Sequence, residues 1–263
     1  YTLAEIFTTQ FTSGSLTATT SNSISVNAGT ATKVIVETNP TGSGTVVPSQ
    51  NLASGNSITV FAVSRDTFDN FVANVAATWS LVDITGGIVA GNFVPNVGDT
   101  SATLTGSIIG TAKIKATYGT LDSIQSGTIT VIPGVGTQLT YTQQPTAGIA
   151  GAVITPPIKV QIKDLVGNNV RNPGDTINIA LQSGSGILSG SIQQISDTAG
   201  TTTFNNLRID QSGLKTLRAY HTIYSSALSD TFTLGTYTIT STAGANGSIS
   251  PLGTVNVNSD GNQ

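Results

Sequence analysis

The 263-residue sequence contains no cysteine and no methionine. Without cysteine, the chain cannot form a disulfide framework, a thiolate nucleophile or a cysteine-ligated metal site. Without either sulfur-containing residue, there is also little for an oxidant to modify. This composition suits a protein that is exposed outside the cell.

Charged side chains are also scarce, at 9% of the residues against roughly 25% in an ordinary soluble domain. The 10 basic and 13 acidic residues are scattered, and no cluster of Lys and Arg occurs. A nucleic-acid partner is therefore not expected, because binding to phosphates requires such a cluster. No apolar run reaches the roughly 18 residues of a transmembrane helix, so no membrane span is expected, and the first residues do not resemble a signal peptide.

Few side chains could carry chemistry. The only histidine is His221, predicted to face solvent on a strand, and the only glutamates are Glu5 and Glu37. There is no Gly-x-Ser-x-Gly element for a nucleophile, and one histidine without cysteine cannot form a usual zinc site. Two glutamates in different parts of the chain do not predict the carboxylate pair of a glycosidase. The sequence therefore predicts no catalytic residue, no cofactor or metal site, and no enzyme activity in this segment.

What the sequence does contain is an internal repeat of about 100 residues. Ser64–Val72 (SRDTFDNFV) returns as Ile162–Val170 (IKDLVGNNV), and Gly110–Val131 returns as Gly213–Leu234. Both pairs combine an alternating apolar pattern with a turn, so the repeated unit is a set of strands rather than a short motif.

The repeat divides the chain into four predicted parts. Residues 30–132 and 133–234 are two complete copies. Residues 1–29 resemble the C-terminal strands of a preceding repeat, or a donor segment, and residues 235–263 resemble the opening strands of a further β-repeat. The chain is thus expected to be a window on a longer array, with two complete domains and ragged tails as the alternative. The connections are short, so the units are expected to follow one another end to end as a rod.

Apolar residues alternate with polar ones within each copy. The positions of 58–63 and 112–116 fall into two faces, and Leu214, Thr216 and Leu217 follow the same trend less regularly. Strands of about 5–8 residues separated by turn residues are typical of an antiparallel sandwich. No window shows an amphipathic helix of useful length.

A run of these segments resembles a known family. ITVFAVSRDTFDNFV, followed by AATWSLVDITGGIVAGNFVP and GTAKIKATYG, is similar to the bacterial Ig-like (Big-type) repeats found in tandem in large secreted and cell-surface proteins. The resemblance implies an all-β fold of tandem immunoglobulin-like antiparallel β-sandwiches and an extracellular location, on the bacterial surface or secreted. The single Trp79 is expected in the core. The second copy departs from the pattern there, with Ile179-Ala180-Leu181.

The repeated element contains an Asp and an Asn at fixed spacing. Asp66 and Asn70 in the first copy correspond to Asp164 and Asn168 in the second, and Asp69 corresponds to a glycine. Asp and Asn close local turns, and Gly, Asn and Asp all tolerate positive φ. The pattern therefore favours a turn used twice, with weak calcium binding by Asp66, Asp69 and Asn70 as the alternative. Phe68, at the tip, is a candidate contact for a neighbouring domain.

The predicted function is structural. The chain is interpreted as a non-catalytic stalk of the bacterial cell surface, or as a subunit of an extracellular filament or surface layer assembled by domain–domain contacts. The predicted partners are neighbouring copies or adjacent repeats, with strand donation by either end as one route. The alternative is an adhesin or carbohydrate-binding module whose partners are host or surface glycans.

Overall fold

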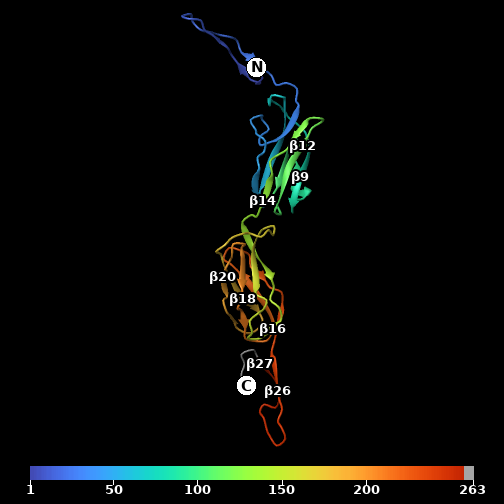
Figure 1. The fold of residues 1–263 in the computed structure, drawn as a ribbon, viewed down its shortest axis with the longest axis vertical. Helices are drawn as coiled ribbons and strands as arrows, with labels where there is room; N and C mark the ends of the chain where they lie inside the picture. The colour runs from blue at the N-terminus through green and yellow to red at the C-terminus, as the bar shows by residue number, and fades with distance from the viewer. Residues whose placement is uncertain (258–263) are drawn as a thin grey trace. The chain divides into compact units, whose positions relative to one another are not determined.

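The computed structural model describes residues 1–257, and the last residues of the predicted segment 235–263 lie outside the described part (Figure 1). These residues form many short β-strands and one 3-10 helix, η1 (Ala90–Asn92). Contacts divide the chain into unit 1, Tyr1–Ile132, and unit 2, Pro133–Gln263. No helix among residues 1–257 has the length and apolarity that a membrane crossing requires.

Unit 1 contains a sandwich of two sheets. The first sheet has the order β10-β11-β7-β5-β13, with β8 paired to β7. Its strands are β5 (Lys33–Glu37), β7 (Ser57–Arg65), β8 (Phe71–Asn74), β10 (Phe93–Pro95), β11 (Ser101–Thr105) and β13 (Asp122–Ile124). The second sheet has the order β6-β14-β12-β9, and Figure 1 shows β14, β12 and β9 side by side. Its strands are β6 (Gln50–Ala53), β9 (Thr78–Gly86), β12 (Gly110–Thr117) and β14 (Ile129–Ile132).

The predicted two-residue periodicity positions the core of unit 1. Val60 and Ala62 on β7, and Ala112, Ile114 and Ala116 on β12, are all fully buried. The residues between them on β12 are only partly buried. Alternate residues point to opposite faces of a strand, so this pattern places one face of each sheet against the other. The prediction of an inward apolar face is confirmed for both strands.

Unit 2 contains a second sandwich with a different division of strands. A three-stranded sheet has the order β15-β17-β21, and the other sheet has the order β16-β25-β23-β18-β20, with β24 paired to β23. The strands are β15 (Gly136–Gln143), β16 (Gly148–Ile149), β17 (Ile158–Asp164), β18 (Thr176–Ser183), β20 (Gln193–Ile195), β21 (Thr201–Phe204), β23 (Gly213–Tyr220), β24 (Ala227–Leu228) and β25 (Phe232–Gly235). A small ribbon pairs β19 (Leu188–Ser189) with β22 (Arg208–Ile209). Each unit is therefore an all-β immunoglobulin-like sandwich.

Two details of the predicted fold need correction. The less regular trend predicted for Leu214, Thr216 and Leu217 holds only in part, because Leu214 is exposed while Lys215, Leu217 and Ala219 are the buried residues of β23. The sandwiches are also not wholly antiparallel, because β13 pairs with β5, β14 with β6 and β16 with β25 in parallel. In the pairs β6–β14 and β16–β25, the opening part of the chain lies beside the last strand of the sandwich. In the third pair, β13, which precedes the last strand of unit 1, lies beside the opening strand β5.

Both ends of the described chain form two-stranded ribbons. In residues 1–29, β1 (Ile6–Phe7) pairs with β4 (Ile24–Ser25), and β2 (Gln10–Phe11) pairs with β3 (Thr19–Thr20). Near the other end, β26 (Tyr237–Ser241) pairs with β27 (Gly253–Val257). None of these three ribbons contributes a residue to the hydrophobic clusters found among the described residues.

Candidate functional site

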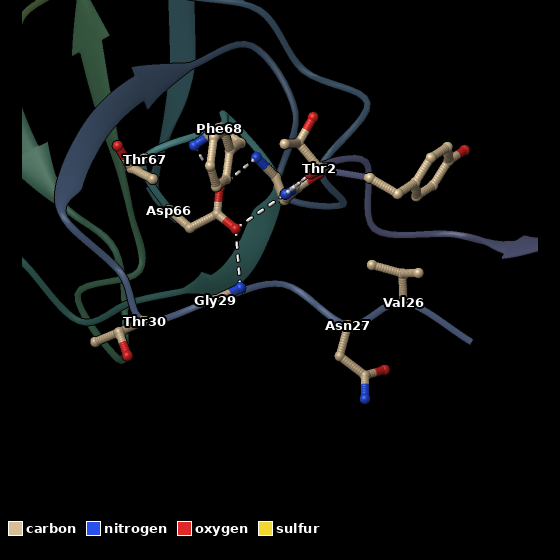
Figure 2. Close-up of a pocket in the computed structure, with 10 residues that line it drawn as sticks. Thr2, Val26, Asn27, Gly29, Thr30, Asp66, Thr67 and Phe68 are labelled. Atoms are coloured by element: carbon tan, nitrogen blue, oxygen red, sulfur yellow. Dashed lines mark hydrogen bonds between the residues drawn. The ribbon is translucent and has the colours of Figure 1, made fainter. Parts of the chain in front are cut away.

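The repeated Asp lies at the centre of a tight turn in unit 1. Asp66 is 2% exposed, and its Oδ1 accepts hydrogen bonds from the backbone N–H groups of Phe68 (2.9 Å) and Asn70 (3.0 Å). Its Oδ2 accepts from the Asn70 side chain (2.9 Å) and from the backbone of Gly29 (2.8 Å). Figure 2 shows the carboxylate between the turn and the Gly29 amide. The side chain thus ties the turn to the connecting segment that enters the sandwich.

The same construction is present in unit 2. Asp164 Oδ1 accepts hydrogen bonds from the N–H groups of Val166 (3.1 Å) and Asn168 (2.8 Å). Asp164 Oδ2 accepts from the Asn168 side chain (2.8 Å) and from the backbone of Gly134 (2.9 Å). Each copy therefore uses one buried aspartate to bind a glycine in its own entry segment.

Backbone conformation explains why the fourth position of the turn differs between the copies. Asp69 has φ +66° and Gly167 has φ +99°. In each turn this residue donates its N–H to the carbonyl of the repeated aspartate. Glycine adopts positive φ without strain and Asp tolerates it, whereas most residues do not. The predicted turn is confirmed in both copies.

Hydrogen bonding sets the ionisation of the Asp66 carboxyl. The Asn70 side chain has the largest effect and lowers the pKa of Asp66 to about 2 from the ordinary value of 3.8. Desolvation opposes this effect, and the backbone N–H groups of Gly29, Asn70 and Phe68 reinforce it. All these donors favour the charged form, so Asp66 is a carboxylate at neutral pH.

The same geometry bears on the alternative of a calcium site. Both oxygens of Asp66 are occupied by N–H donors, and the carboxylate of Asp69 forms an ion pair with Lys33 at 2.6 Å. The carbonyl oxygen of the Asn70 side chain accepts the N–H of Ala4. The three side chains therefore offer no common point to a cation that needs about six to eight oxygen ligands. Among residues 1–257, no group of three or more His, Asp or Glu residues is placed to hold a metal.

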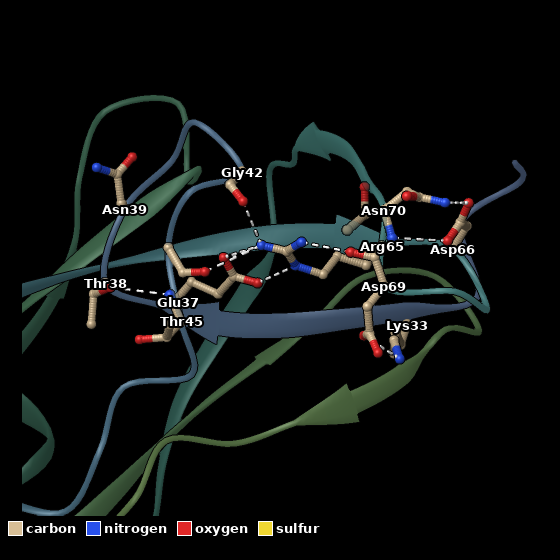
Figure 3. A network of polar contacts seen from close by, with 12 residues as sticks. Lys33, Glu37, Thr38, Asn39, Gly42, Thr45, Arg65, Asp66, Asp69 and Asn70 are labelled. Atoms are coloured by element: carbon tan, nitrogen blue, oxygen red, sulfur yellow. Dashed lines mark hydrogen bonds and ion pairs between the residues drawn. The ribbon is translucent and has the colours of Figure 1, made fainter. Parts of the chain in front are cut away.

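A polar network lies beside the turn in unit 1 (Figure 3). The Arg65 guanidinium forms a bidentate pair with Glu37, with N–O distances of 2.5 and 2.9 Å. It also donates to the carbonyl groups of Gly42 (3.0 Å), Gly44 (3.3 Å) and Asp69 (2.6 Å). The hydrogen bond with Glu37, which is 1% exposed, raises the pKa of Arg65. This network fixes the loop after β5 and the turn after β7 to one side chain.

A hollow of about 220 Å³ lies between the turn and the N-terminal segment. Phe68, at the tip of the turn, is 60% exposed and forms part of its wall. Figure 2 shows the ring of Phe68 above Asp66 and the side chains of Val26 and Asn27 on the neighbouring segment. The residues that line the hollow are Tyr1, Thr2, Val26, Asn27, Gly29, Thr30, Asp66, Thr67, Phe68 and Asn70.

The other singled-out aromatic side chain has a structural position. Trp79 is only partly buried, and it packs against the core of unit 1 with its ring edge toward Phe93 (centroids 6.1 Å apart). Its indole N–H donates to the carbonyl of Asp99 at 2.8 Å. The prediction of a buried core residue is therefore correct only in part, because the ring packs against the core but stays partly exposed, and the indole N–H binds a loop carbonyl.

His221 is not a strand residue, contrary to the prediction, because β23 ends at Tyr220. Its ring stacks on Tyr224, with centroids 4.5 Å apart. The Tyr224 hydroxyl donates to Asp175, whose carboxylate also accepts from Asn172 at 2.6 Å. Burial, followed by the hydrogen bond to Asp175, raises the pKa of Tyr224. This cluster is not predictable from the sequence, because no local pattern connects residues from separate loops.

The entry glycines are likewise not predictable from the sequence. Gly29 and Gly134 precede their aspartates by several tens of residues, and the loops between differ in length. The one usable signal was a glycine in each short connecting segment. A Cβ on Gly29 would lie 3.4 Å from Asp66 Oδ2, at ordinary contact distance, so the hydrogen bond to Asp66 depends on the backbone N–H and not on the absence of a side chain.

No protein-family model and no curated protein matches the sequence. Among solved structures, the chain is similar to the Escherichia coli adhesin FdeC, at 19% identity over 81% of this chain and 67% of that one, with a TM-score of 0.41. It is similar to the Yersinia pseudotuberculosis adhesin InvE at 20% identity over 70% of this chain and 56% of that one, with a TM-score of 0.29. A Bacteroides uniformis β-glucuronidase matches at 14% identity over 69% of this chain and 23% of that one, with a TM-score of 0.28. These likenesses concern the fold alone, and the chain spans only part of each protein.

Proposed function

We propose that this chain is a non-catalytic structural segment of an extracellular bacterial surface protein, in which Ig-like (Big-type) repeats form the stalk of an adhesin-type molecule. The observation that carries the proposal is the tie between each repeated aspartate and its entry glycine, Asp66 to Gly29 and Asp164 to Gly134. A stalk must keep its modules in order under load, and a connecting segment that is hydrogen-bonded to its own sandwich has few free torsions. The same aspartate–glycine hydrogen bond is present in both copies, which is expected if every repeat must restrain its own connecting segment.

The connecting segment between the two sandwiches is correspondingly short. β14 ends at Ile132 and β15 begins at Gly136, and Gly134 is bonded to Asp164 within the intervening stretch. The carbonyl of Ile132 accepts the N–H of Ser54. The free length of chain is therefore too small for a flexible tether.

Small-angle scattering tests the mechanical part of this proposal. We expect the Asp66→Asn, Asp164→Asn double variant to show a broader distance distribution than the wild type, with circular dichroism confirming that both proteins are folded. A matched double variant at exposed carboxylates, Asp122→Asn with Asp230→Asn, controls for the change in charge. Identical distributions for all three proteins would remove the mechanical argument. Protease shaving of intact cells tests the location, and full protection of the chain would exclude the surface.

A specific observation favours a second candidate function, direct adhesion. The hollow beside the turn combines exposed aromatic surface at Phe68 with the polar side chains of Asn27, Thr30 and Thr67. Sugars bind by stacking on such rings together with hydrogen bonds to polar groups. A glycan array with wild type and Phe68→Ala decides this candidate. Binding that is lost in the variant supports it, and an array without hits counts against it.

Self-association of neighbouring copies is a further form of the structural proposal. The surface is poor in charge, at 9% of residues, and weak self-repulsion permits close contact between copies. Negative-stain electron microscopy of surface material distinguishes the forms. Regular fibres or a lattice would indicate a filament or surface layer, and isolated thin particles would indicate a stalk.

A further inference from the structure

Asn70 holds the backbone of the N-terminal segment at two points. The N–H of Ala4 donates to Asn70 Oδ1 at 2.8 Å, and Asn70 Nδ2 donates to the carbonyl of Thr2 at 2.7 Å. Leu3, between these two residues, lies in a bend of the chain, and the carbonyl of Thr2 and the N–H of Ala4 converge on the same side-chain amide. One amide side chain therefore satisfies a main-chain acceptor and a main-chain donor of this segment.

The amide is held in this orientation by the turn itself. Asn70 is 7% exposed, and its Nδ2 also donates to Asp66 Oδ2 at 2.9 Å. Its backbone N–H donates to Asp66 Oδ1 at 3.0 Å. The partners of Nδ2 and Oδ1 therefore fix the orientation of the Asn70 side-chain amide. A receptor whose side chain is already fixed loses little rotational freedom when it binds.

The contacts involve only main-chain atoms of the bound segment. The side chain of Thr2 is exposed and that of Ala4 is half-buried, and neither forms a hydrogen bond with Asn70. Phe68 adds apolar surface at the wall of the hollow that Tyr1 and Thr2 also line. Recognition of this kind does not depend on which residues occupy the segment.

We propose that the Asp66–Asn70 turn is a docking site for a short, bent backbone segment that precedes the sandwich in the chain, recognised through its main chain and not through its sequence. The second copy carries the same pre-oriented amide, because Asn168 Nδ2 donates to Asp164 Oδ2 at 2.8 Å. The spacing Asp-x-x-x-Asn is then a signature of this docking site. The inference does not depend on what the assembled protein binds.

Variants of Ala4 on the full chain separate main-chain from side-chain recognition. Ala4→Pro removes the N–H that Asn70 accepts, and Ala4→Ser keeps it while changing the side chain. We expect Ala4→Pro to speed hydrogen exchange of the Asn70 side-chain amide by on the order of tenfold, the loss expected from one or two hydrogen bonds. Ala4→Ser should leave the rate unchanged. An equal effect of both variants would overturn the proposal, because it would place recognition in the side chain.

The reciprocal variant is Asn70→Ala, followed through the backbone amide of Ala4 by NMR. Exchange of this amide should speed up by a similar factor, while Asn168→Ala, which disrupts the matching turn of unit 2, should not change it. Equal Ala4 exchange rates in wild type and Asn70→Ala would contradict the docking site. Because Ala4→Pro leaves the turn itself intact, the test survives if Asn70→Ala disturbs the folding of unit 1.

Discussion

The two sandwiches share a repeat but assign two short segments to different sheets. In unit 1, the segment after β9 forms β10, which pairs with β11 in the sheet that contains β5 and β7. In unit 2, the corresponding segment forms β20, which pairs with β18 in the opposite sheet. As a result, β9 is an edge strand and β18 is covered on both sides. The strand that follows β12 or β23 differs as well, because β13 pairs with β5 whereas β24 pairs with β23. The sheet that receives these two short segments is therefore not fixed by the repeat.

The uncovered edge of unit 1 carries features that discourage further pairing. The ladder between β9 and β12 is irregular between Thr111 and Lys113. Asp83, on the β9 edge, has φ +52° and forms an exposed ion pair with Lys113 at 2.7 Å. Bulges and charges on an edge strand oppose the addition of another strand. In unit 2, β20 pairs with the corresponding edge of β18, so a bulge and charged residues are not needed there to prevent further pairing.

Two further positions differ in how polar groups are buried. Arg65 of unit 1 corresponds to Lys163 of unit 2, and both donate to the carbonyl of the positive-φ turn residue. Only Arg65 also binds a buried glutamate, since β15 contains no acidic residue. At matching positions of β12 and β23, Ala112 of unit 1 corresponds to Lys215 of unit 2, and both are buried. The turn is common to both copies, while its supports are specific to each.

The largest predicted difference concerns the basic residue before the turn. Arg65→Ala leaves the carboxylate of Glu37 buried without its partner, which costs about 3–5 kcal/mol. Lys163→Ala removes one hydrogen bond from a partly exposed ammonium and should cost about 1 kcal/mol or less. Urea unfolding followed by Trp79, the only tryptophan, reports unit 1, and calorimetry reports unit 2. Equal losses in the two variants would show that the pair with Glu37 adds nothing.

A smaller effect is expected from the buried lysine of unit 2. Lys215 is 1% exposed, and its ammonium donates to the carbonyl of Ser212 at 2.8 Å. If the stem fills the core as Ala112 does in unit 1, Lys215→Ala should cost about 2 kcal/mol through the cavity that it leaves. Lys215→Met keeps the stem and should cost under about 1 kcal/mol. Calorimetry of unit 2 measures both, and a methionine variant as unstable as the alanine variant would assign the role to the charge.

The response of unit 1 to acid follows from Asp66. Its folded pKa of about 2 lies below the ordinary 3.8, so its contribution to stability is complete above about pH 4 and is lost as pH falls toward 2. We expect the urea midpoint of unit 1, followed by Trp79 fluorescence, to fall over this window. Asp66→Asn should start from a lower midpoint and show a shallower fall, whereas Asp122→Asn, at an exposed carboxylate on β13, should keep the wild-type slope. A variant slope as steep as that of the wild type would assign the acid response to other groups.

The smallest predicted effect exchanges the fourth turn residue. Gly167→Ala places a Cβ at φ +99°, where nothing else lies within contact distance, so the cost should be backbone strain of about 1–2 kcal/mol. Asp69→Gly removes an exposed ion pair and relieves φ +66°, and these effects should nearly cancel within about 1 kcal/mol. Thermal unfolding of both variants checks the pair of values. A strongly destabilised Asp69→Gly would mean that the ion pair with Lys33 is structurally important.

Much of the fold could be predicted from the sequence by period and composition. Alternation on β7 and β12 placed Val60, Ala62, Ile114 and Ala116 in the core, because a strand turns alternate residues to opposite faces. The same reasoning failed on β23. Its alternation keeps the register of β12, with Lys215 inside and Leu214 outside. A lysine therefore occupies an inward position that its polarity predicts to be exposed.

By itself, the sequence determined the all-β class, the repeat and the turn, because each depends on local rules: strand periodicity, spacing, and tolerance of positive φ at Asp69 and Gly167. Only the tertiary structure decided which sheet receives β10 or β20, that Asp66 and Asp164 bind entry glycines, and that Asn70 holds the backbone of Thr2 and Ala4. These features join groups that are far apart in the chain. The side chains of Asp66, Asp164 and Asn70 bind main-chain atoms in these contacts. Because every residue carries such atoms, no side-chain pattern in the sequence predicts which residues are bound.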